Sequence, residues 1–577
     1  MDASAGAADS CQIDVGDVTW VMVASVLVLG MMPGLAFFEA GLLRRQNTMS
    51  IIMQVMSGLP VLSVLWYLFG FSLTFGTDHG GVIGDFRHGL FIGIDFNTCW
   101  RSYRIPQAAY AIFQLMFAAI TPLLMTGAYA ERMRFKASFM YTILWEIFIY
   151  YPLAHWIWGG GWLDTMGVED FAGGIVIHTS AGTGAIVCAL VLGRRPGFEK
   201  THGEWPPSNF PLATVGAALL LTGWVGFNAG SALEAGSLAV QTVLNTQVGG
   251  SMSGVVWLIL SWVHNRKPSV LDCMNGVIGG LAGITPASGY ISTPSALLVG
   301  MILGFVGFYG VRLLKHRWHI DDALDVSSVH GLTGLVGALA IGFCGDSSVN
   351  PAGANGLIYG EGRLLGVQVL AIVVAIVYPG VLTWVILKVV DATVGLRHRV
   401  EKEGRGLDFN DHREMAYQLF LEKSSEGEEH DRVWAVFPRS ETGGFSIGED
   451  VEQHGMGPRK DSDMLQLPAE MPPSLLQPGK QNSSFSTILA AKETEAMHLP
   501  SSPSEGAQGG AQTTRQINVV PLTSFSRGHS LFVGTTDRHQ QQDPLSPPAR
   551  LAQPIRRANS VTQGTRDLQA PLLNRDF

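Results

Sequence analysis

Charged side chains are scarce in this chain. They make up 15% of its 577 residues, whereas 47% are hydrophobic, and soluble domains carry about 25% charged residues. The net charge of -9 offers no basic surface for nucleic acid. The five cysteines form neither a CxxC pair nor a Cys/His metal spacing. We therefore expect no nucleic-acid partner, no metal and no cofactor, and the composition favours a membrane protein.

Recognisable catalytic motifs are also missing. The apolar segments contain no Ser/His/Asp set, no HExxH and no P-loop, and Lys388 lies near the end of the last apolar segment. The sequence therefore predicts a protein that is not an enzyme. A membrane-embedded enzyme or proton pump is the alternative of a different class.

Long apolar runs are abundant. A helix needs about 20 apolar residues to cross the hydrocarbon core, and eleven runs approach that length. An all-α polytopic membrane protein is therefore expected, with eleven transmembrane helices in a domain spanning 18–391. The expected spans are 18–43, 51–76, 108–130, 137–158, 171–193, 211–228, 237–263, 270–288, 292–313, 325–345 and 364–391.

The distribution of charge predicts the orientation. Every second loop holds the clustered Lys and Arg, beginning with Arg44 and Arg45, whereas the N-terminal segment 1–17 contains four Asp and no Lys or Arg. Because basic loops stay on the cytoplasmic side, we expect an extracellular N-terminus and a cytosolic C-terminus. The segment 418–577 is rich in Ser, Pro, Gln and Gly, so we expect a disordered cytosolic tail on which kinases or other regulators act, for example at Ser502 and Ser546.

The chain contains an internal repetition. Asp170 stands eight residues before His178, Asp322 stands eight residues before His330, and a glycine follows each histidine by four residues. Five spans per copy is an odd number, so the second copy would be inserted upside down. The sequence thus predicts two inverted five-helix repeats and one extra helix, with the substrate path between the repeats.

Two histidines at matching places in inverted repeats should approach each other near the pseudo-axis. Ionisable groups inside a membrane usually face a cavity or one another. Neutral imidazoles donate and accept hydrogen bonds, so a pair of them suits a narrow pore that passes a proton or a small polar molecule. Structural histidines within a helix bundle are the alternative.

Several motifs then match a known family. PGLAFFEAGLLRRQN, WGGG, FAGGxxxH, GWxGFNAGS, GxTPASGY and DDALDVxxVHG occur in this order. Over about residues 15–417 the chain resembles the Amt/Mep ammonium transporters. The resemblance implies a homotrimer with one pore per protomer, in a membrane that is expected to be the plasma membrane. It also implies ammonium or ammonia as substrate, recruited at an outer aromatic site, deprotonated, and conducted past the twin histidines.

The resemblance assigns roles to particular residues. Trp158, Phe113 and Ser231 would bind the substrate, because an aromatic face and a hydroxyl suit a cation with four N–H donors. Phe117 and Phe227 would close the pore below this site, above His178 and His330. Asp170 and Asp325 would support the site. In the family, the carboxylate at the position of Asp170 supports the site electrostatically and structurally and does not contact the ion.

Other residues depart from the family or need a partner. Glu39 replaces a common aromatic and is expected to reach Arg44 or the interface. Glu146, inside the fourth span, should face protein. The cytosolic region 392–417 resembles the part that packs beneath a neighbouring subunit in the family, and Asn410 stands where plant members have a phosphorylatable Thr.

Three questions stay open at this level. The substrate moves either as net ammonium, with charge, or as neutral ammonia through a gas channel. The protein is alternatively an ammonium sensor or transceptor that signals through its tail. Cys11 and Cys99 both lie on the predicted extracellular side, where they form a disulfide, within or between protomers, or remain free thiols.

Overall fold

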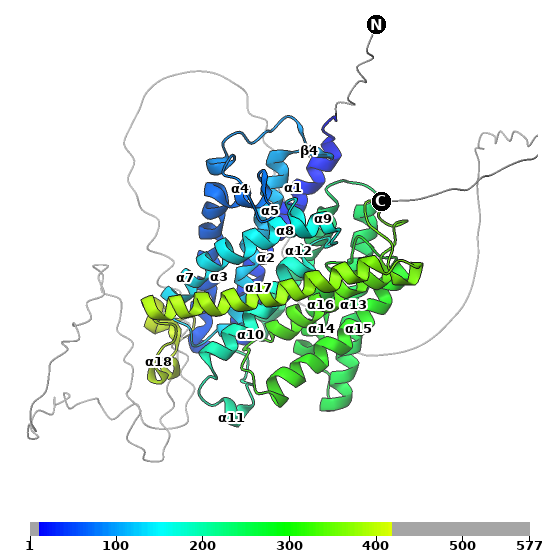
Figure 1. Ribbon diagram of the computed structural model, residues 1–577. Helices are drawn as coiled ribbons and strands as arrows, with labels where there is room; N and C mark the ends of the chain where they lie inside the picture. The colour runs from blue at the N-terminus through cyan, green and yellow to red at the C-terminus, as the bar shows by residue number, and fades with distance from the viewer. Residues whose placement is uncertain (1–10, 418–577) are drawn as a thin grey trace, which may run out of the picture. The chain divides into compact units, whose positions relative to one another are not determined.

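The computed structural model describes residues 11–417, all of which belong to one compact unit (Figure 1). The predicted tail 418–577, with its Ser-Pro sites, lies outside the described residues, as does most of the N-terminal segment.

Within residues 11–417, nine helices are long and apolar enough to cross a membrane. Each consists of one continuous element or of consecutive helical segments. They are α1 (Val15–Leu29) with α2 (Met31–Leu42); η1 (Arg45–Asn47), α3 (Thr48–Leu65), η2 (Trp66–Gly70) and α4 (Phe71–Phe75); α5 (Gln107–Ile120), η4 (Pro122–Met125) and α6 (Thr126–Tyr129); η6 (Gly174–Thr179) with α10 (Ser180–Leu192); α12 (Phe210–Ala229) with η7 (Gly230–Ala232); α13 (Ser237–Asn265); α15 (Thr293–Val311) with η8 (Arg312–Arg317); η9 (Ser327–Leu332) with α16 (Thr333–Cys344); and α17 (Arg363–Val394).

The other two expected spans are also helical but do not belong to these nine. The expected span 137–158 consists of α7 (Phe135–Trp145), η5 (Glu146–Tyr150) and α8 (Tyr151–Trp158), whose Glu, His and Tyr side chains lower its hydropathy. The expected span 270–288 is the 15-residue α14 (Val270–Ile284). Thr285, after the last helical residue, still has helical backbone angles, and Pro286 has no backbone N–H to continue the helical hydrogen bonds. Nine of the eleven expected spans are therefore long, apolar helices, and the other two are helical but less apolar or shorter.

The remaining elements are short and lie in the connections. Two antiparallel strand pairs are β1 (Asp78–His79) with β2 (Ile83–Gly84), and β3 (Cys99–Trp100) with β4 (Tyr103–Pro106). The short helices are η3 (Gly89–Phe91), α9 (Trp162–Met166), α11 (Phe198–Thr201), η10 (Leu357–Tyr359), α18 (Val400–Arg405) and η11 (Asp408–His412).

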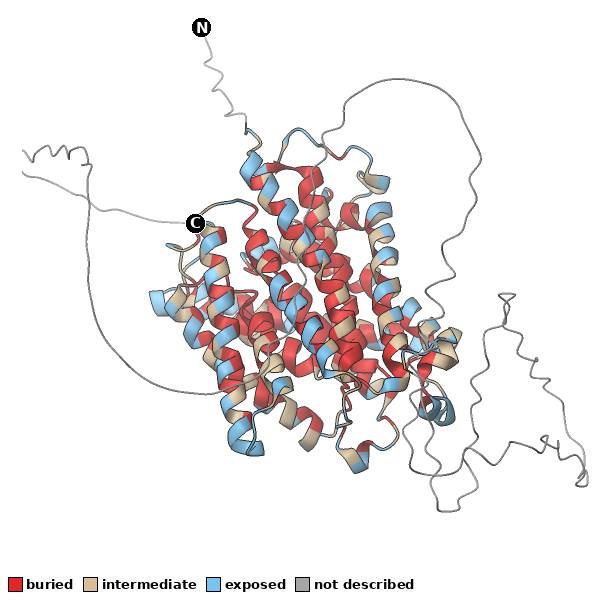
Figure 2. Cartoon of the chain, turned by 180° about the vertical axis from the view of Figure 1, so that it is seen from behind, coloured by how far each residue is buried: buried red, intermediate tan, exposed pale blue. Residues whose placement is uncertain are grey.

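The outward faces of the helices are apolar. In Figure 2 the helices show buried faces toward one another and exposed faces outward. In a soluble protein the exposed face would be polar, whereas here large hydrophobic side chains occupy it, which suits contact with lipid tails. On α17, which runs across the front of the other helices in Figure 1, these side chains are Val369, Val373, Val377, Val381 and Trp384.

Buried charges join several connections at one end of the bundle. The Glu131 carboxylate accepts from Arg44 Nε at 3.0 Å and from Arg195 Nη1 at 2.7 Å. Arg195 Nη2 also lies 2.7 Å from Asp321 Oδ1. Although burial opposes ionisation, the Arg195 and Arg44 charges lower the pKa of Glu131 to about 2. We call Arg44, Glu131, Arg195 and Asp321 the charged network.

The segment after α17 packs on the same end of its own protomer. Arg397 Nη1 donates to Leu192 O at 2.6 Å, and Asp408 Oδ1 accepts from the Ser50 backbone N–H at 2.7 Å. Asn410 Nδ2 donates to Gly406 O at 2.6 Å. The segment thereby contacts both the helix that carries His178 and the second span.

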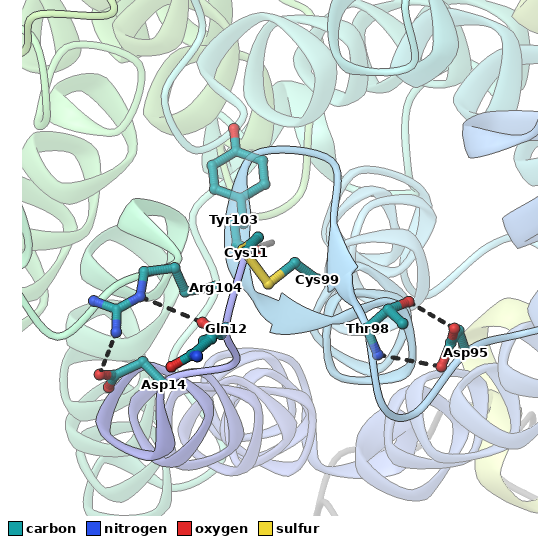
Figure 3. The surroundings of a disulfide bond; sticks show 8 residues. All are labelled: Cys11, Gln12, Asp14, Asp95, Thr98, Cys99, Tyr103 and Arg104. Atoms are coloured by element: carbon teal, nitrogen blue, oxygen red, sulfur yellow. Dashed lines mark hydrogen bonds and ion pairs between the residues drawn. A yellow bond between two sulfur atoms is a disulfide. The ribbon is translucent and has the colours of Figure 1, made fainter. Parts of the chain in front are cut away.

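A disulfide lies at the opposite end. Cys11 is bonded to Cys99, with a Cα–Cα distance of 6.1 Å (Figure 3). An ion pair between Arg104 and Asp14, 2.9 Å long, lies beside it. The bond within one protomer answers the question that the sequence left open, and it ties the N-terminal segment to the loop between α4 and α5.

Candidate functional site

Each histidine lies in a helical segment at whose start an aspartate side chain accepts backbone N–H hydrogen bonds, four at Asp170 and one at Asp322. Asp170 accepts from Gly173, Gly174, Ile175 and Val176 at 2.7–3.0 Å, at the start of η6. These are the N–H groups that lack a partner within a helix.

Asp322 has the matching position before η9. Its Oδ2 accepts from the Ser327 backbone N–H at 2.7 Å and from the Ser327 hydroxyl at 2.6 Å. The two aspartates therefore fix the starts of the two segments that hold His178 and His330.

Glycines let these two segments touch. A Cβ added to Gly182 would lie 2.2 Å from Gly331 Cα, and one added to Gly334 would lie 2.8 Å from His178 Cβ. Gly182 contacts Gly331, and His178, four residues earlier on the same segment, contacts Gly334, three residues later on the other segment. The segments therefore cross in antiparallel directions, in close backbone contact.

The two imidazole rings meet at this crossing, as the repeated spacing predicted. His178 Nδ1 lies 3.3 Å from His330 Nδ1. Because both atoms cannot donate at once, one neutral ring donates and the other accepts. The side chains are 2% and 8% exposed, and His178 Nε2 has no hydrogen-bond partner among the described residues.

Aromatic rings form a continuous series above the histidines. Phe227 lies 6.0 Å from His178 between ring centroids and stacks on Phe117 at 4.3 Å. Phe117 in turn meets Trp158 edge-on at 6.2 Å. The stacked pair, each residue 1% exposed, thus lies between the tryptophan and the histidines.

The three expected recruiting residues surround the outer side of this stack. Trp158 Nε1 donates to Asp170 O at 2.8 Å, which fixes the indole on the start of η6. Phe113 lies 4.8 Å from Phe117. The Ser231 hydroxyl donates to Phe227 O at 3.0 Å, which leaves its oxygen lone pairs available to accept.

Comparisons with known proteins show the family. The profile described as Ammonium Transporter Family matches residues 19–417. Ammonium transporter 1 of Dictyostelium discoideum is 59% identical over 406 residues, which are 70% of this chain and 88% of that protein. The chain belongs to the ammonium transporter family.

Two further relatives support the assignment. An ammonium transporter of Bacillus subtilis is 38% identical over 406 residues, covering 70% of this chain and 99% of its own. The crystal structure of Saccharomyces cerevisiae Mep2 is similar with a TM-score of 0.63 at 30% identity, covering 67% of this chain and 91% of that one.

Asp325 of this family member has surroundings different from those of Asp170. Its Oδ1 forms an ion pair with Lys315 Nζ at 2.7 Å, and its backbone has a φ of +60°. Its supporting role remains a prediction. The carboxylate that accepts from a backbone N–H at the start of the second histidine segment is Asp322. The equal eight-residue spacing to each histidine was the signal for it.

A cavity of about 30 Å³ borders the histidine pair. Besides His178 and His330, its wall includes Trp224, Asn275 and Glu39, with mostly aliphatic side chains elsewhere. Sequence reasoning missed Trp224, which stacks near His330 at 6.3 Å between centroids, although it belongs to the GWxGFNAGS motif.

The expectation for Glu39 was wrong. Its side chain is 2% exposed, and Oε2 accepts from the Thr126 hydroxyl at 2.7 Å. Arg44, the expected partner, binds Glu131 instead. The carboxyl therefore turns into the bundle and borders the cavity, because a nearer acceptor occupies the arginine.

Glu146 behaves as expected in facing protein. It is fully buried, and neither carboxyl oxygen has a hydrogen-bond partner among the described residues. It does not border the cavity beside the histidines.

Proposed function

We propose that this protein moves ammonium across a membrane through a pore formed by Trp158, the Phe117–Phe227 stack and the histidine pair. The observation that carries the proposal is the direct approach of His178 and His330 beneath the stack, 3.3 Å apart. The names of the relatives, which are ammonium transporters, support the same substrate.

The pore uses two kinds of chemistry. A cation is attracted to the face of Trp158 and Phe113 and donates to Ser231. An unpaired ammonium ion is costly inside an apolar pore, so the ion loses a proton at the outer site. Ammonia then passes the stack and hydrogen-bonds to the imidazoles, which donate or accept as neutral rings.

The proposed architecture has eleven spans, in two inverted five-helix repeats plus α17. The antiparallel crossing of the two histidine segments and their matching aspartates support the repeats. An extracellular N-terminus and a cytosolic C-terminus follow from the basic loops, and the charged network lies at the proposed cytosolic end. We further propose a homotrimer in the plasma membrane.

The proposed domains are an extracellular segment 1–17, a transporter domain 18–391, a cytosolic regulatory region 392–417 and a cytosolic tail 418–577. The contacts of Arg397 and Asp408 support a regulatory role for 392–417, because they join that region to two spans of the pore domain. The tail is the proposed place where regulators act. No catalytic role is proposed.

The test is uptake of labelled methylammonium by proteoliposomes. The wild-type protein should accumulate label above empty liposomes, and the double variant His178→Ala/His330→Ala should lose uptake or selectivity while still assembling, because both rings line the pore. Assembly is checked by size-exclusion chromatography. Wild-type flux and selectivity in the double variant would rule out the histidine pathway.

A further inference from the structure

Glu39 is a carboxyl group without a cationic partner beside the proposed pore. Among residues 11–417, no Lys, Arg or His nitrogen lies within 4.0 Å of its oxygens. The one side-chain donor to it is the Thr126 hydroxyl, at 2.7 Å. The Gly127 backbone N–H also donates to this carboxyl. An anion buried with neutral donors alone is costly in a membrane helix bundle. Binding a proton or a cation relieves that cost.

The neighbourhood places this carboxyl next to the segment that leads to His330. A Cβ added to Gly127 would meet Glu39 Oε1 at 2.8 Å, Val326 Cγ2 at 3.0 Å and Leu324 Cβ at 3.2 Å. Leu324 N–H donates to Gly127 O at 3.1 Å, which holds the two chains together. Glu39 therefore lies between α6 and the start of the second histidine segment.

The cavity joins Glu39 to the histidines. Glu39, His178 and His330 all border it, and Glu39 is the sole carboxyl group in its wall as the structure describes that wall. The polar groups bordering it include the carboxyl, the Asn275 amide and the imidazole nitrogens, which can serve as hydrogen-bond partners of water. A proton can therefore reach the carboxyl from the imidazoles without a direct contact between them.

We propose that Glu39 is the inner proton acceptor of the pore, a role that rests on the proposed transport function. The proton lost by ammonium at the outer site crosses the histidine pair and binds the Glu39 carboxylate, forming a carboxylic acid. Ammonia that has passed the histidines takes this proton as it leaves, which restores the carboxylate and forms ammonium. One positive charge then enters with each ammonia molecule.

The test measures the charge moved for each labelled methylammonium in the same proteoliposomes. Glu39→Gln keeps the size of the side chain and an amide oxygen for the Thr126 hydroxyl, but it cannot accept the proton. We expect the current per methylammonium to fall roughly 100-fold, the factor that a positioned proton acceptor typically contributes, while labelled uptake persists. A purely structural role would lower current and uptake together and leave the ratio unchanged.

Glu146→Gln is the matched control, because Glu146 is also a buried carboxyl in a membrane helix but does not border the cavity. Its charge ratio should equal that of the wild type. If Glu39→Gln does not assemble, Glu39→Asp is compared with Glu39→Asn, whose side chain has the same length. Glu39→Asp should move more charge per methylammonium than Glu39→Asn.

The outcomes separate the two proposals. An unchanged ratio in Glu39→Gln, or in Glu39→Asn relative to Glu39→Asp, would overturn the role of Glu39. Wild-type uptake without any current would overturn it too, while leaving transport itself intact. Absence of wild-type uptake would instead refute the proposed function.

Discussion

Gly182→Ala should disrupt the histidine pair without touching either imidazole. The new methyl carbon would lie 2.2 Å from Gly331 Cα and 2.5 Å from Gly331 N, and ordinary contact begins at 3.4 Å. The obstacle is backbone and not a flexible side chain, so the two segments must separate by about 1.2 Å at this point.

Such a separation exceeds what the ring contact can absorb. The Nδ1–Nδ1 distance is already 3.3 Å, and hydrogen bonds between nitrogens weaken steeply beyond that length. A misplacement of about 1 Å can cost roughly 100-fold in a reaction that depends on positioned groups. Overpacking of the interior should also cost about 1–3 kcal/mol of stability.

The assay is the initial rate of methylammonium uptake per assembled protein, together with the thermal unfolding temperature. Gly366→Ala on α17 is the matched control, because a Cβ there meets nothing within 4 Å. We expect a large loss of rate in Gly182→Ala and none in the control. A wild-type rate in Gly182→Ala, in protein of normal assembly, would refute the claim that this backbone contact positions the histidines.

Four further outcomes are expected. Trp158→Leu should raise the KM for methylammonium about tenfold with little change in maximal rate, since a partly desolvated cation–π contact is worth about 1–2 kcal/mol; equal KM values would contradict the recruiting role. Truncation at about residue 420 should keep substantial uptake, whereas truncation before Gly395 should impair it through the lost contacts of the region that follows; equal rates would remove the coupling role. Glu131→Gln should lower stability by about 3–5 kcal/mol because it removes the carboxylate partner of Arg44 and one of the two carboxylate partners of Arg195. In the wild type, this carboxylate should stabilise fully above its unfolded pKa of about 4.3 and lose that contribution as the pH falls towards about 2, which acid unfolding monitored for both proteins would check. Cys99→Ser should lower the unfolding temperature to that of reduced wild type, by an amount reflecting about 2–4 kcal/mol, without changing uptake.

The helices and the histidine pair were largely predictable from local signals. Apolar runs marked the spans because a membrane helix must be apolar over its length, and equal Asp-to-His spacing marked the two crossing segments. The length of α14 was misjudged because one residue, Pro286, ends a run that hydropathy alone extends to 288. The polar side chains of α7, η5 and α8 similarly explain why this helical span is not one of the nine long apolar helices.

The partners of the charged side chains were not predictable in the same way. Glu39 was expected to reach Arg44, which is close in sequence, or the interface, but Arg44 binds Glu131, 87 residues away. Such pairings depend on how loops meet after the helices have packed. For the same reason, the sequence contained no signal that Glu39 would turn into the pore cavity, nor that Glu146 would lie buried without a hydrogen-bond partner in the described part of the chain.

Glu131 and Asp321 differ from Glu39 in what surrounds them. Glu131 and Asp321 each lie within 3.0 Å of an arginine nitrogen, so they remain ionised and hold the connections in place. Arg44 follows the helix that carries Glu39, and Asp321 precedes the segment that carries His330. The charged network therefore positions both walls of the inner cavity. Glu39 lacks a fixed cation, as the proposed uptake and release of a proton require. Because Arg44 of the network directly follows the helix that carries Glu39, the effects of changing both should not add independently.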